Sequence, residues 1–443
     1  MRLRRNVVAT GLVAAGLVTG CTAADPDPQG QAGQTSGSAS EAITTGSQTG
    51  DAAPSESTGP AESTGSASPT PSTEPTESTE PTESTESTES PPATGPFDPR
   101  EITVVMNGDM LLHEGLWATA EIDAARTGRG RMDFRPLLAS MRPVVKGADL
   151  SLCHMETPLA PPGGPFLGYP VFAAPPAIVP ALRWEGFDVC TTASNHSIDQ
   201  GFEGLTRTLA RFEAAGIETV GTAATRPASR EPLLVEVDDV TVGLISATYG
   251  TNGIPLPEEA PWSVELLNTE KIARLAARAR DDGADVVMVA LHWGLEYTHE
   301  PTADQIAVAE KLTSLPDVDL IYGHHAHVVQ PYGKVNGNWV LYGLGNAIAQ
   351  QDTAVSGVYD GNTSRVTFVE RRDGSFRVEK LEYLPTMITT FDGVNPMRWL
   401  NVPASLDDPS LADLHDELRA TSARVAPIIN MLGAFRRGVT EVE

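Results

Sequence analysis

The chain has 443 residues and is acidic, with 58 Asp and Glu against 31 Lys and Arg and a formal net charge of −27. Residues 22–100 hold thirteen acidic residues and one Arg, so residues 101–443 still carry a net charge of −18. This balance provides no basic footprint for nucleic acid and argues against such a partner. It does not exclude a small anionic ligand held by a metal ion.

Residues 1–21 resemble a bacterial lipoprotein signal peptide. Arg2, Arg4 and Arg5 precede an apolar run at 7–18 that is too short to span a bilayer comfortably, and small residues lead to Cys21. An ordinary secretory signal with an incidental Cys is the alternative. We expect Cys21 to be acylated, to begin the mature chain and to hold it at the extracytoplasmic face of the cell membrane.

Residues 22–98 are rich in Ser, Thr, Pro and Glu and carry almost no large apolar side chains, so they cannot bury enough surface to fold. Glutamates recur every third residue from Glu74 to Glu89, which matches the polyproline II repeat. We expect a disordered, extended stalk that lifts a folded domain off the membrane. Glycosylation of the stalk is left open.

Short apolar runs after residue 99 predict strands. Each run ends in polar, metal-competent or Gly-rich residues, and ligand sites of open α/β sheets lie at the carboxyl ends of strands. The sequence therefore predicts one shared site at these ends. The runs occupy residues 102–106, 149–153, 188–192, 286–291, 320–322 and 340–342.

Apolar residues at helical spacing predict helices at 203–215, 271–280 and 303–315, the last opened by a capping box of Thr302 and Gln305. Hairpins are expected at 233–245 and 365–383. The folded domain is placed at 99–395, and a C-terminal helical extension at 396–443. Cys153 and Cys190 lie in apolar runs, either as buried thiols or as a disulfide.

Three of the nine histidines stand together at the end of the run 320–322, as His324, His325 and His327. His325 and His327 are two residues apart, so an extended backbone would point them the same way. Neutral imidazole suits zinc, iron, nickel and copper and tolerates manganese. A His-rich surface loop or an adventitious metal tract is the alternative interpretation.

The ordered set of motifs resembles the CapA family of poly-γ-glutamate capsule biosynthesis proteins, a divergent branch of the calcineurin-like metallophosphoesterases. The set runs from Gly108-Asp109 through Glu156-Thr157-Pro158-Leu159, Ala193-Ser194-Asn195-His196, His292-Trp293-Gly294 and the histidine triplet to Gly345-Asn346. The resemblance implies an α/β, metallo-dependent phosphatase-like four-layer sandwich, in which two mixed β-sheets are flanked by helices. It also implies two divalent ions, Mn, Fe or Zn, in one site.

Carried over position by position, the resemblance assigns six metal ligands, two catalytic residues and three supporting residues. The ligands are Asp109, Glu156, Asn195, His292, His325 and His327; the catalytic pair is Asn195 and His196; and the supporting residues are His154, His324 and Asn346. His154 stands where the family has Asn, and is either an extra ligand or a supporting donor. The family's parent pattern Asp-x-His is also broken, since Leu111 replaces its histidine.

The resemblance implies a role in synthesis, export or anchoring of a capsular or cell-envelope polymer such as poly-γ-glutamate, with polymer synthase and export proteins as partners. A metal-dependent hydrolase of a phosphoester or amide is one alternative, and a non-catalytic polymer-binding scaffold is another. Gln305 is expected to be a helix cap, and His299 and His415 to be exposed and uninvolved.

Overall fold

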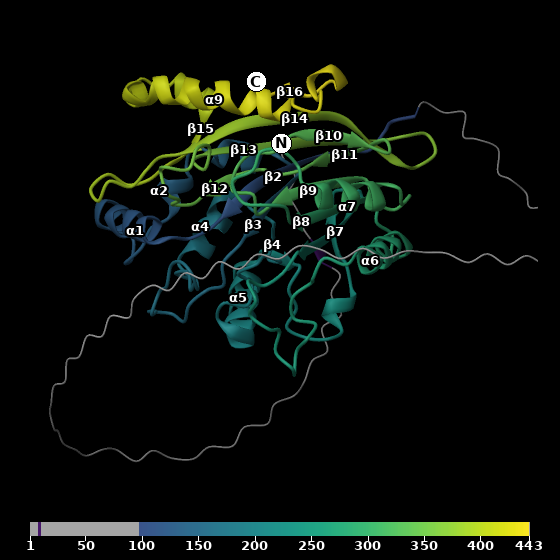
Figure 1. Cartoon of the computed structure of the whole chain (residues 1–443), viewed down its shortest axis with the longest axis horizontal. Helices are drawn as coiled ribbons and strands as arrows, with labels where there is room; N and C mark the ends of the chain where they lie inside the picture. The colour runs from purple at the N-terminus through teal and green to yellow at the C-terminus, as the bar shows by residue number, and fades with distance from the viewer. Residues whose placement is uncertain (1–7, 10–96, 443) are drawn as a thin grey trace, which may run out of the picture. The chain divides into compact units, whose positions relative to one another are not determined.

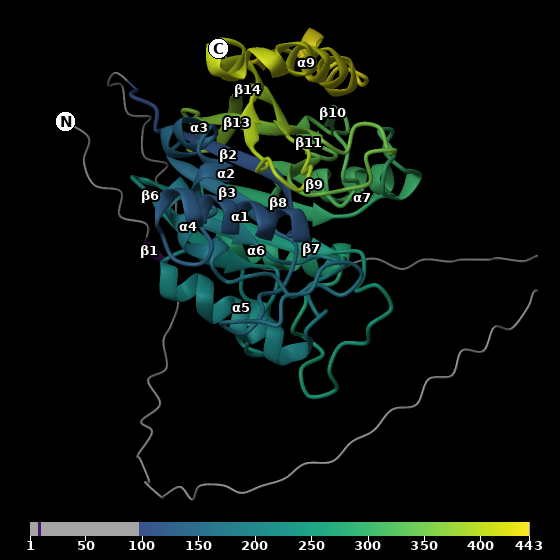
Figure 2. The same ribbon diagram turned by 90° about the vertical axis from the view of Figure 1, so that its left-hand side faces the viewer.

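The computed structural model describes residues 8–9 and 97–442, which Figures 1 and 2 show from two sides. Cys21, most of the expected signal peptide and nearly all of the expected stalk lie outside the described residues. Within the described residues, no helix is both long and apolar enough to cross a membrane.

The described residues form two mixed β-sheets. The seven-stranded sheet has the order β1 (Val8–Ala9), β6 (Leu233–Val237), β7 (Val240–Thr248), β8 (Val286–His292), β9 (Leu320–His324), β11 (Asn338–Leu341), β10 (Tyr332–Val335). The nine-stranded sheet has the order β15 (Trp399–Asn401), β14 (Phe376–Ile388), β13 (Asp360–Glu370), β2 (Glu101–Met110), β3 (Leu150–Met155), β4 (Val189–Thr191), β5 (Glu218–Val220), with β12 (Asn346–Ile348) on β2 and β16 (Thr440–Glu441) on β14.

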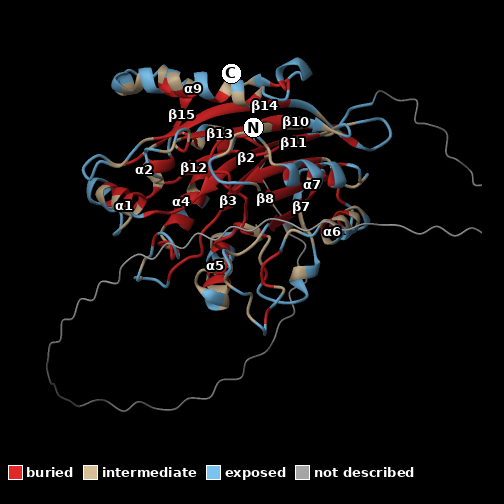
Figure 3. Ribbon diagram, in the orientation of Figure 1, coloured by how far each residue is buried: buried red, intermediate tan, exposed pale blue. Residues whose placement is uncertain are grey.

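The two sheets pack face to face through one buried apolar cluster. Val104 and Leu152 of the nine-stranded sheet share this cluster with Met288 and Leu320 of the seven-stranded sheet, and all four are at most 1% exposed. Figure 3 shows the buried strands as a continuous inner zone. Strands buried on both faces read as continuous apolar runs, which is why their sequence signal was strong.

Helices cover the outer faces of both sheets, so the fold has four layers and the predicted fold class is confirmed. One cluster joins the nine-stranded sheet to its helices, and another joins the seven-stranded sheet to α6 and α7. The helices are α1 (Glu114–Thr127), α2 (Arg135–Leu138), α3 (Arg142–Gly147), α4 (Ile178–Glu185), α5 (Gly201–Ala215), α6 (Thr269–Asp281), α7 (Ala303–Thr313), α8 (Val402–Leu406) and α9 (His415–Ile429).

The predicted strands, hairpins and helices all occur, with ends shifted by a few residues. Thr302 and Gln305 form the predicted capping box at the start of α7. The C-terminal residues are helical in α8 and α9, but β15 and β16 also pair with β14, so this segment adds strands to the nine-stranded sheet. The short strands β15 and β16 have too few residues to give a period in the sequence.

Two residues of the expected signal peptide pair with the edge of a sheet. Val8 and Ala9 form β1, which pairs antiparallel with Glu236 and Val235 of β6. The edge strand β6 offers backbone donors and acceptors that an extended segment satisfies. The pairing covers two residues only.

Cys153 and Cys190 face each other on the neighbouring parallel strands β3 and β4, with a Cα–Cα distance of 4.4 Å, and are joined as a disulfide. Both side chains are buried in the cluster beneath the helices. Of the two states that the sequence left open, the structure has the bridged one.

Candidate metal centre

The predicted site residues meet where strands of both sheets end. Asp109 belongs to β2, Glu156 follows β3, His292 ends β8 and His324 ends β9. The Nδ1–H of His324 donates to Oδ1 of Asp109 over 2.9 Å, across 215 residues of sequence. The site therefore bridges the two sheets, and its shape depends on how they pack.

Asp109 is fully buried and is held by hydrogen bonds from the histidine loop. Its Oδ2 accepts the backbone N–H of His325 over 3.0 Å and lies 3.3 Å from Nδ1 of His327. Burial alone would raise the pKa of the Asp109 carboxyl, but hydrogen bonds from His324 and His327 together hold it well below its usual range. The residue is therefore an anion inside the protein.

Glu156 is fully buried, and neither of its carboxylate oxygens has a hydrogen-bond partner. Its Oε1 lies 3.7 Å from Nε2 of His292 and 3.8 Å from Nε2 of His327, between the two rings. Burial raises the pKa of this carboxyl well above its usual range. An unpartnered buried carboxylate is costly, and a cation between the histidines would supply the missing partner.

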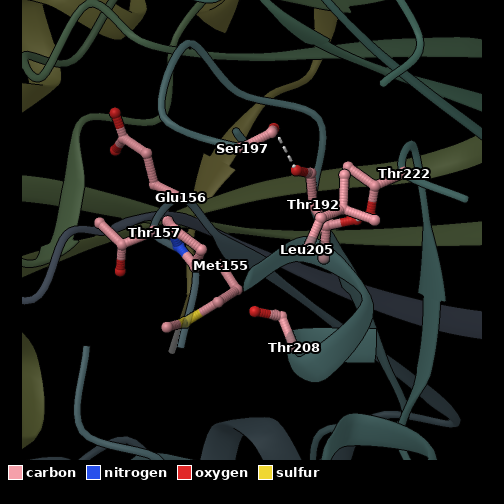
Figure 4. Close-up of a pocket in the computed structure, with 9 residues that line it drawn as sticks. Met155, Glu156, Thr157, Thr192, Ser197, Leu205, Thr208 and Thr222 are labelled. Atoms are coloured by element: carbon pink, nitrogen blue, oxygen red, sulfur yellow. Dashed lines mark hydrogen bonds between the residues drawn. The ribbon is translucent and has the colours of Figure 1, made fainter. Parts of the chain in front are cut away.

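The backbone behind Glu156 is tied to the loop that carries Asn195. The hydroxyl of Ser194 donates to the Glu156 carbonyl over 2.6 Å, and Ser197 donates to the Thr192 carbonyl over 2.7 Å. Figure 4 shows this region, with the Glu156 carboxylate directed away from Leu205 and Thr208. The cavity drawn there has a volume of about 10 Å³, enough for one water at most, so it is no substrate pocket.

His292 and Asn195 form the second half of the site. Nε2 of His292 lies 2.9 Å from Oδ1 of Asn195, and Nδ1 of His292 lies 3.0 Å from Nε2 of His154. The other ring nitrogen of His154 lies 2.8 Å from the hydroxyl of Thr191. His154 thus orients the ring of His292 from behind, as outer partners of metal-binding imidazoles do.

The loop after β9 presents His325 and His327. Nδ1 of His327 donates to Oδ1 of Asn346 over 3.0 Å, which leaves Nε2 toward Glu156. Burial would lower the pKa of His327, but the charges of Glu156 and Asp109 outweigh it and raise the pKa to about 9. Burial lowers the pKa of His325 to about 3, and its Nδ1 has no hydrogen-bond partner.

His196 stands beside these groups with a carboxylate partner of its own. Its Nδ1–H donates to Oδ2 of Asp199 over 2.8 Å, and its ring packs edge-on against Phe172 at 4.8 Å. A carboxylate that holds one ring nitrogen leaves the other free to give or take a proton. The ring of His196 is therefore oriented as an acid–base group would be, and its catalytic role stays a prediction.

The donor set fits divalent cations. Three groups of residues place ligand atoms within 4.8 Å of one another: Asp109, His154 and His324; Asp109, Glu156 and His327; and Glu296, His325 and His327. Imidazoles and carboxylates are the donors that zinc, iron and manganese take. Among the buried atoms of these groups, both Glu156 carboxylate oxygens, Nε2 of His324 and Nδ1 of His325 have no hydrogen-bond partner.

Each predicted ligand and supporting residue lies in this region, and their metal-binding roles stay predictions. His324 is hydrogen-bonded to Asp109, His154 to His292, and Asn346 to His327. His299 and His415 were expected to be exposed, but both are half-buried. His299 contacts the Val329 carbonyl, and His415 contacts the Asp408 carbonyl.

Three further residues lie beside the site without a role predicted from the sequence. Asp199 and Glu296 follow two of the motifs closely, three residues after His196 and four after His292, and this spacing was the available signal. Tyr249, whose ring centroid lies 4.6 Å from that of His325, follows β7 and had no sequence signal.

Two solved protein structures show a distant likeness to this chain. The calcineurin-like phosphoesterase YfkN of Bacillus subtilis has a TM-score of 0.36 and 14% identity, covering 73% of this chain and 100% of that chain. The NAD nucleotidase of Haemophilus influenzae has a TM-score of 0.39 and 11% identity, covering 74% and 61%.

Comparison by sequence is more informative. A Mycobacterium tuberculosis protein described as a probable polyglutamine synthesis accessory protein is 28% identical over 288 residues, which cover 57% of this chain and 75% of the relative. The capsule biosynthesis protein CapA of Bacillus anthracis is 30% identical over 177 residues, 39% of this chain and 43% of that relative. The model of the family described as bacterial capsule synthesis protein PGA_cap matches residues 103–351, which contain every predicted ligand of the site. This chain therefore belongs to that family of capsule synthesis proteins.

Proposed function

We propose that this chain is a lipid-anchored protein of the extracytoplasmic membrane face that acts in synthesis, export or anchoring of a capsular polymer, with two divalent ions in its site. The polymer class proposed is a glutamate or glutamine polyamide such as poly-γ-glutamate. Family membership and the names of the relatives in Mycobacterium and Bacillus support this class. Polymer synthase and export proteins are the partners proposed.

The observation that carries the proposal is the position of Glu156. Its unpartnered carboxylate lies between His292 and His327. His292 contacts Asn195, and His327 contacts Asp109. Together with these neighbours, Glu156 would hold divalent cations and balance part of their charge. No hydrogen bond within the described residues reaches the carboxylate oxygens of Glu156.

The chain's own groups divide the chemical work. With metal bound, Asp109 and Glu156 would supply negative charge, while Asn195 and the deprotonated histidine rings would supply neutral donors. Two bound divalent ions would polarise a carbonyl or phosphoryl oxygen and lower the pKa of water. His196, held by Asp199, is placed to protonate a leaving nitrogen or oxygen.

A metal-dependent hydrolase that cleaves an amide or phosphoester is a second candidate function. The His196–Asp199 pair favours it, because a scaffold that only binds polymer needs no oriented acid beside its metal site. Under this candidate the same residues trim or release polymer.

Metal content tests the proposal. Purified protein is expected to hold one or two divalent ions per chain by elemental analysis, and Glu156→Ala, His325→Ala and His327→Ala are each expected to lower that content sharply. His415→Ala is the control, since that ring contacts only the Asp408 carbonyl among the described hydrogen bonds. Wild-type protein that takes up no metal after reconstitution would leave the scaffold as the better account.

Turnover separates the two functions. Metal-loaded protein that cleaves a poly-γ-glutamate or polyglutamine probe, with loss of activity in His196→Ala but unchanged metal content, would support the hydrolase. Metal-loaded protein that binds the probe without cleavage would support a role in export or anchoring.

The location is proposed from the leader and supported by the disulfide. Bridges such as Cys153–Cys190 persist in oxidising compartments outside the cytoplasm. Mass spectrometry of the mature N-terminus is expected to find an acylated Cys21, and Cys21→Ser is expected to abolish membrane retention. An unmodified Cys21 on a secreted chain would contradict the anchor.

A further inference from the structure

Two loops that flank the site are locked together in unusual backbone conformations. The backbone N–H of Tyr297, on the loop after β8, donates to the Ala326 carbonyl on the loop after β9 over 2.7 Å. Tyr297, His325 and His327 have φ of 61°, 89° and 55°. Such values are rare for residues other than glycine and cost about 1–3 kcal/mol each. The fold holds these loops in one arrangement at the site.

The arrangement brings Glu296 to the two outer histidines. One carboxylate oxygen of Glu296 and one ring nitrogen each of His325 and His327 lie within 4.8 Å of one another. His325 is only 4% exposed and has an unpartnered Nδ1, whereas Glu296 is exposed. The histidines thus approach from the protein side and the carboxylate from the solvent side.

We propose that Glu296 is an additional metal ligand, which together with His325 and His327 would hold one cation on the solvent side of the site. Two imidazoles and one carboxylate are donors that Fe²⁺, Mn²⁺ and Zn²⁺ accept while keeping coordination positions open. The inference rests on the proposed metal centre and extends it by a residue for which the sequence argument gave no role.

Because Glu296 is exposed, it is the metal ligand that another anion could most easily replace. The exposed Glu296 carboxylate would be solvated by water when it leaves an ion, whereas the buried Asp109 and Glu156 have no such alternative. An anionic group of the substrate, such as a carboxylate of a glutamate polymer, would replace Glu296 at the ion. The exposed carboxylate then acts as a substitute for substrate in the resting protein.

Metal affinity tests the assignment without reference to activity. Mn²⁺ is titrated into the metal-free mature chain by calorimetry, with free Mn²⁺ followed by electron paramagnetic resonance. Glu296→Gln removes the charge and keeps the shape, and is expected to weaken at least one binding event by about ten-fold or more. Glu300→Gln, an exposed glutamate four residues further along the same loop, is the matched control and is expected to bind within about two-fold of wild type.

A double variant sharpens the result. If Glu296 and His325 bind the same ion, Glu296→Gln combined with His325→Ala is expected to lose less affinity than the two single losses together. Unchanged Mn²⁺ affinity in Glu296→Gln, or an equal loss in Glu300→Gln, would overturn the assignment and leave the centre itself intact. Wild-type protein that binds no Mn²⁺ would overturn both.

Discussion

Two buried glutamates show how surroundings decide what a carboxylate does. Glu156 and Glu185 are both fully buried, and neither has a hydrogen-bond partner for its carboxylate. Glu156 lies among histidines and carboxylates that can share a cation. Glu185 is the last residue of α4, and the charges that act on its carboxyl are those of Arg142 and Lys146. The surroundings of Glu156 suit a metal ligand, and those of Glu185 make the stability of the fold depend on pH.

Glu185 gives a test of this contrast that is independent of metal. Burial raises the pKa of Glu185 to about 9, while the charges of Arg142 and Lys146 act in the opposite direction. Because the folded-state pKa lies above the unfolded value, the neutral carboxyl contributes its full stability below about pH 4.5 and loses it as pH rises toward 9. The slope in that window is at most about 1.4 kcal/mol per pH unit.

Glu185→Gln cannot ionise, so its thermal unfolding temperature is expected to fall less than that of wild type between pH 5 and pH 9. A difference on the order of several degrees is expected by pH 8.5, measured by calorimetry or circular dichroism. Glu213→Gln on the exposed face of α5 is the control and should follow wild type. Parallel curves for wild type and Glu185→Gln would contradict the burial argument.

At the scale of elements, the site depends on one close crossing of backbones. The N–H of Asp109 donates to the Gly345 carbonyl over 2.9 Å, and a Cβ added at Gly108 would lie 2.1 Å from that same oxygen. Only glycine lets the end of β2 approach Gly345 so closely. The next residue, Asn346, hydrogen-bonds His327, so the crossing positions both sides of the site.

Gly108→Ala is therefore expected to destabilise the protein by about 1–3 kcal/mol or more in urea unfolding, and to weaken metal binding as well. The clash is with backbone, which cannot rotate away. Gly147→Ala at the end of α3 meets no atom within 4 Å and is expected to be neutral or slightly stabilising. Equal stability of the two variants would show that the crossing tolerates a side chain.

The elements that the sequence predicted best are those whose signal is local. Apolar runs marked the strands ahead of Asp109, Glu156 and His292, and spacing marked α7 with its capping box. The partition of strands between two sheets was implied only by the family resemblance. It depends on contacts such as Asp109–His324, which join residues 215 positions apart and leave no periodicity.

The same distinction explains what was left open at the site. The role of His154 was undecided because its contact with His292 spans 138 residues, and the disulfide was undecided because spacing cannot fix geometry. Glu296 lies four residues after His292, but its approach to His325 and His327 depends on the positive φ of Tyr297. A side-chain pattern carries no direct record of such a backbone turn.

At the scale of the whole molecule, the described apolar core contains no residue of the expected stalk. The apolar clusters that join the two sheets and cover them with helices draw on residues between Ile102 and Val442. The only described part of the expected signal peptide is the two-residue strand β1 on the edge of β6. A folded unit of this kind should need neither the leader nor the stalk for stability.

We expect three chain lengths to unfold at the same temperature: the full chain, a chain starting at Cys21 and a chain starting at Pro99. Residues 22–98 lack the large apolar side chains that would add to the core, and β1 contributes only the pairing of Val8 and Ala9. Calorimetry of the three at equal pH and metal loading measures this directly. A fall of several degrees from the full chain to the Cys21 chain would assign a stabilising role to β1. The same fall on reaching Pro99 would correspond to about 1 kcal/mol or more and would contradict a passive stalk.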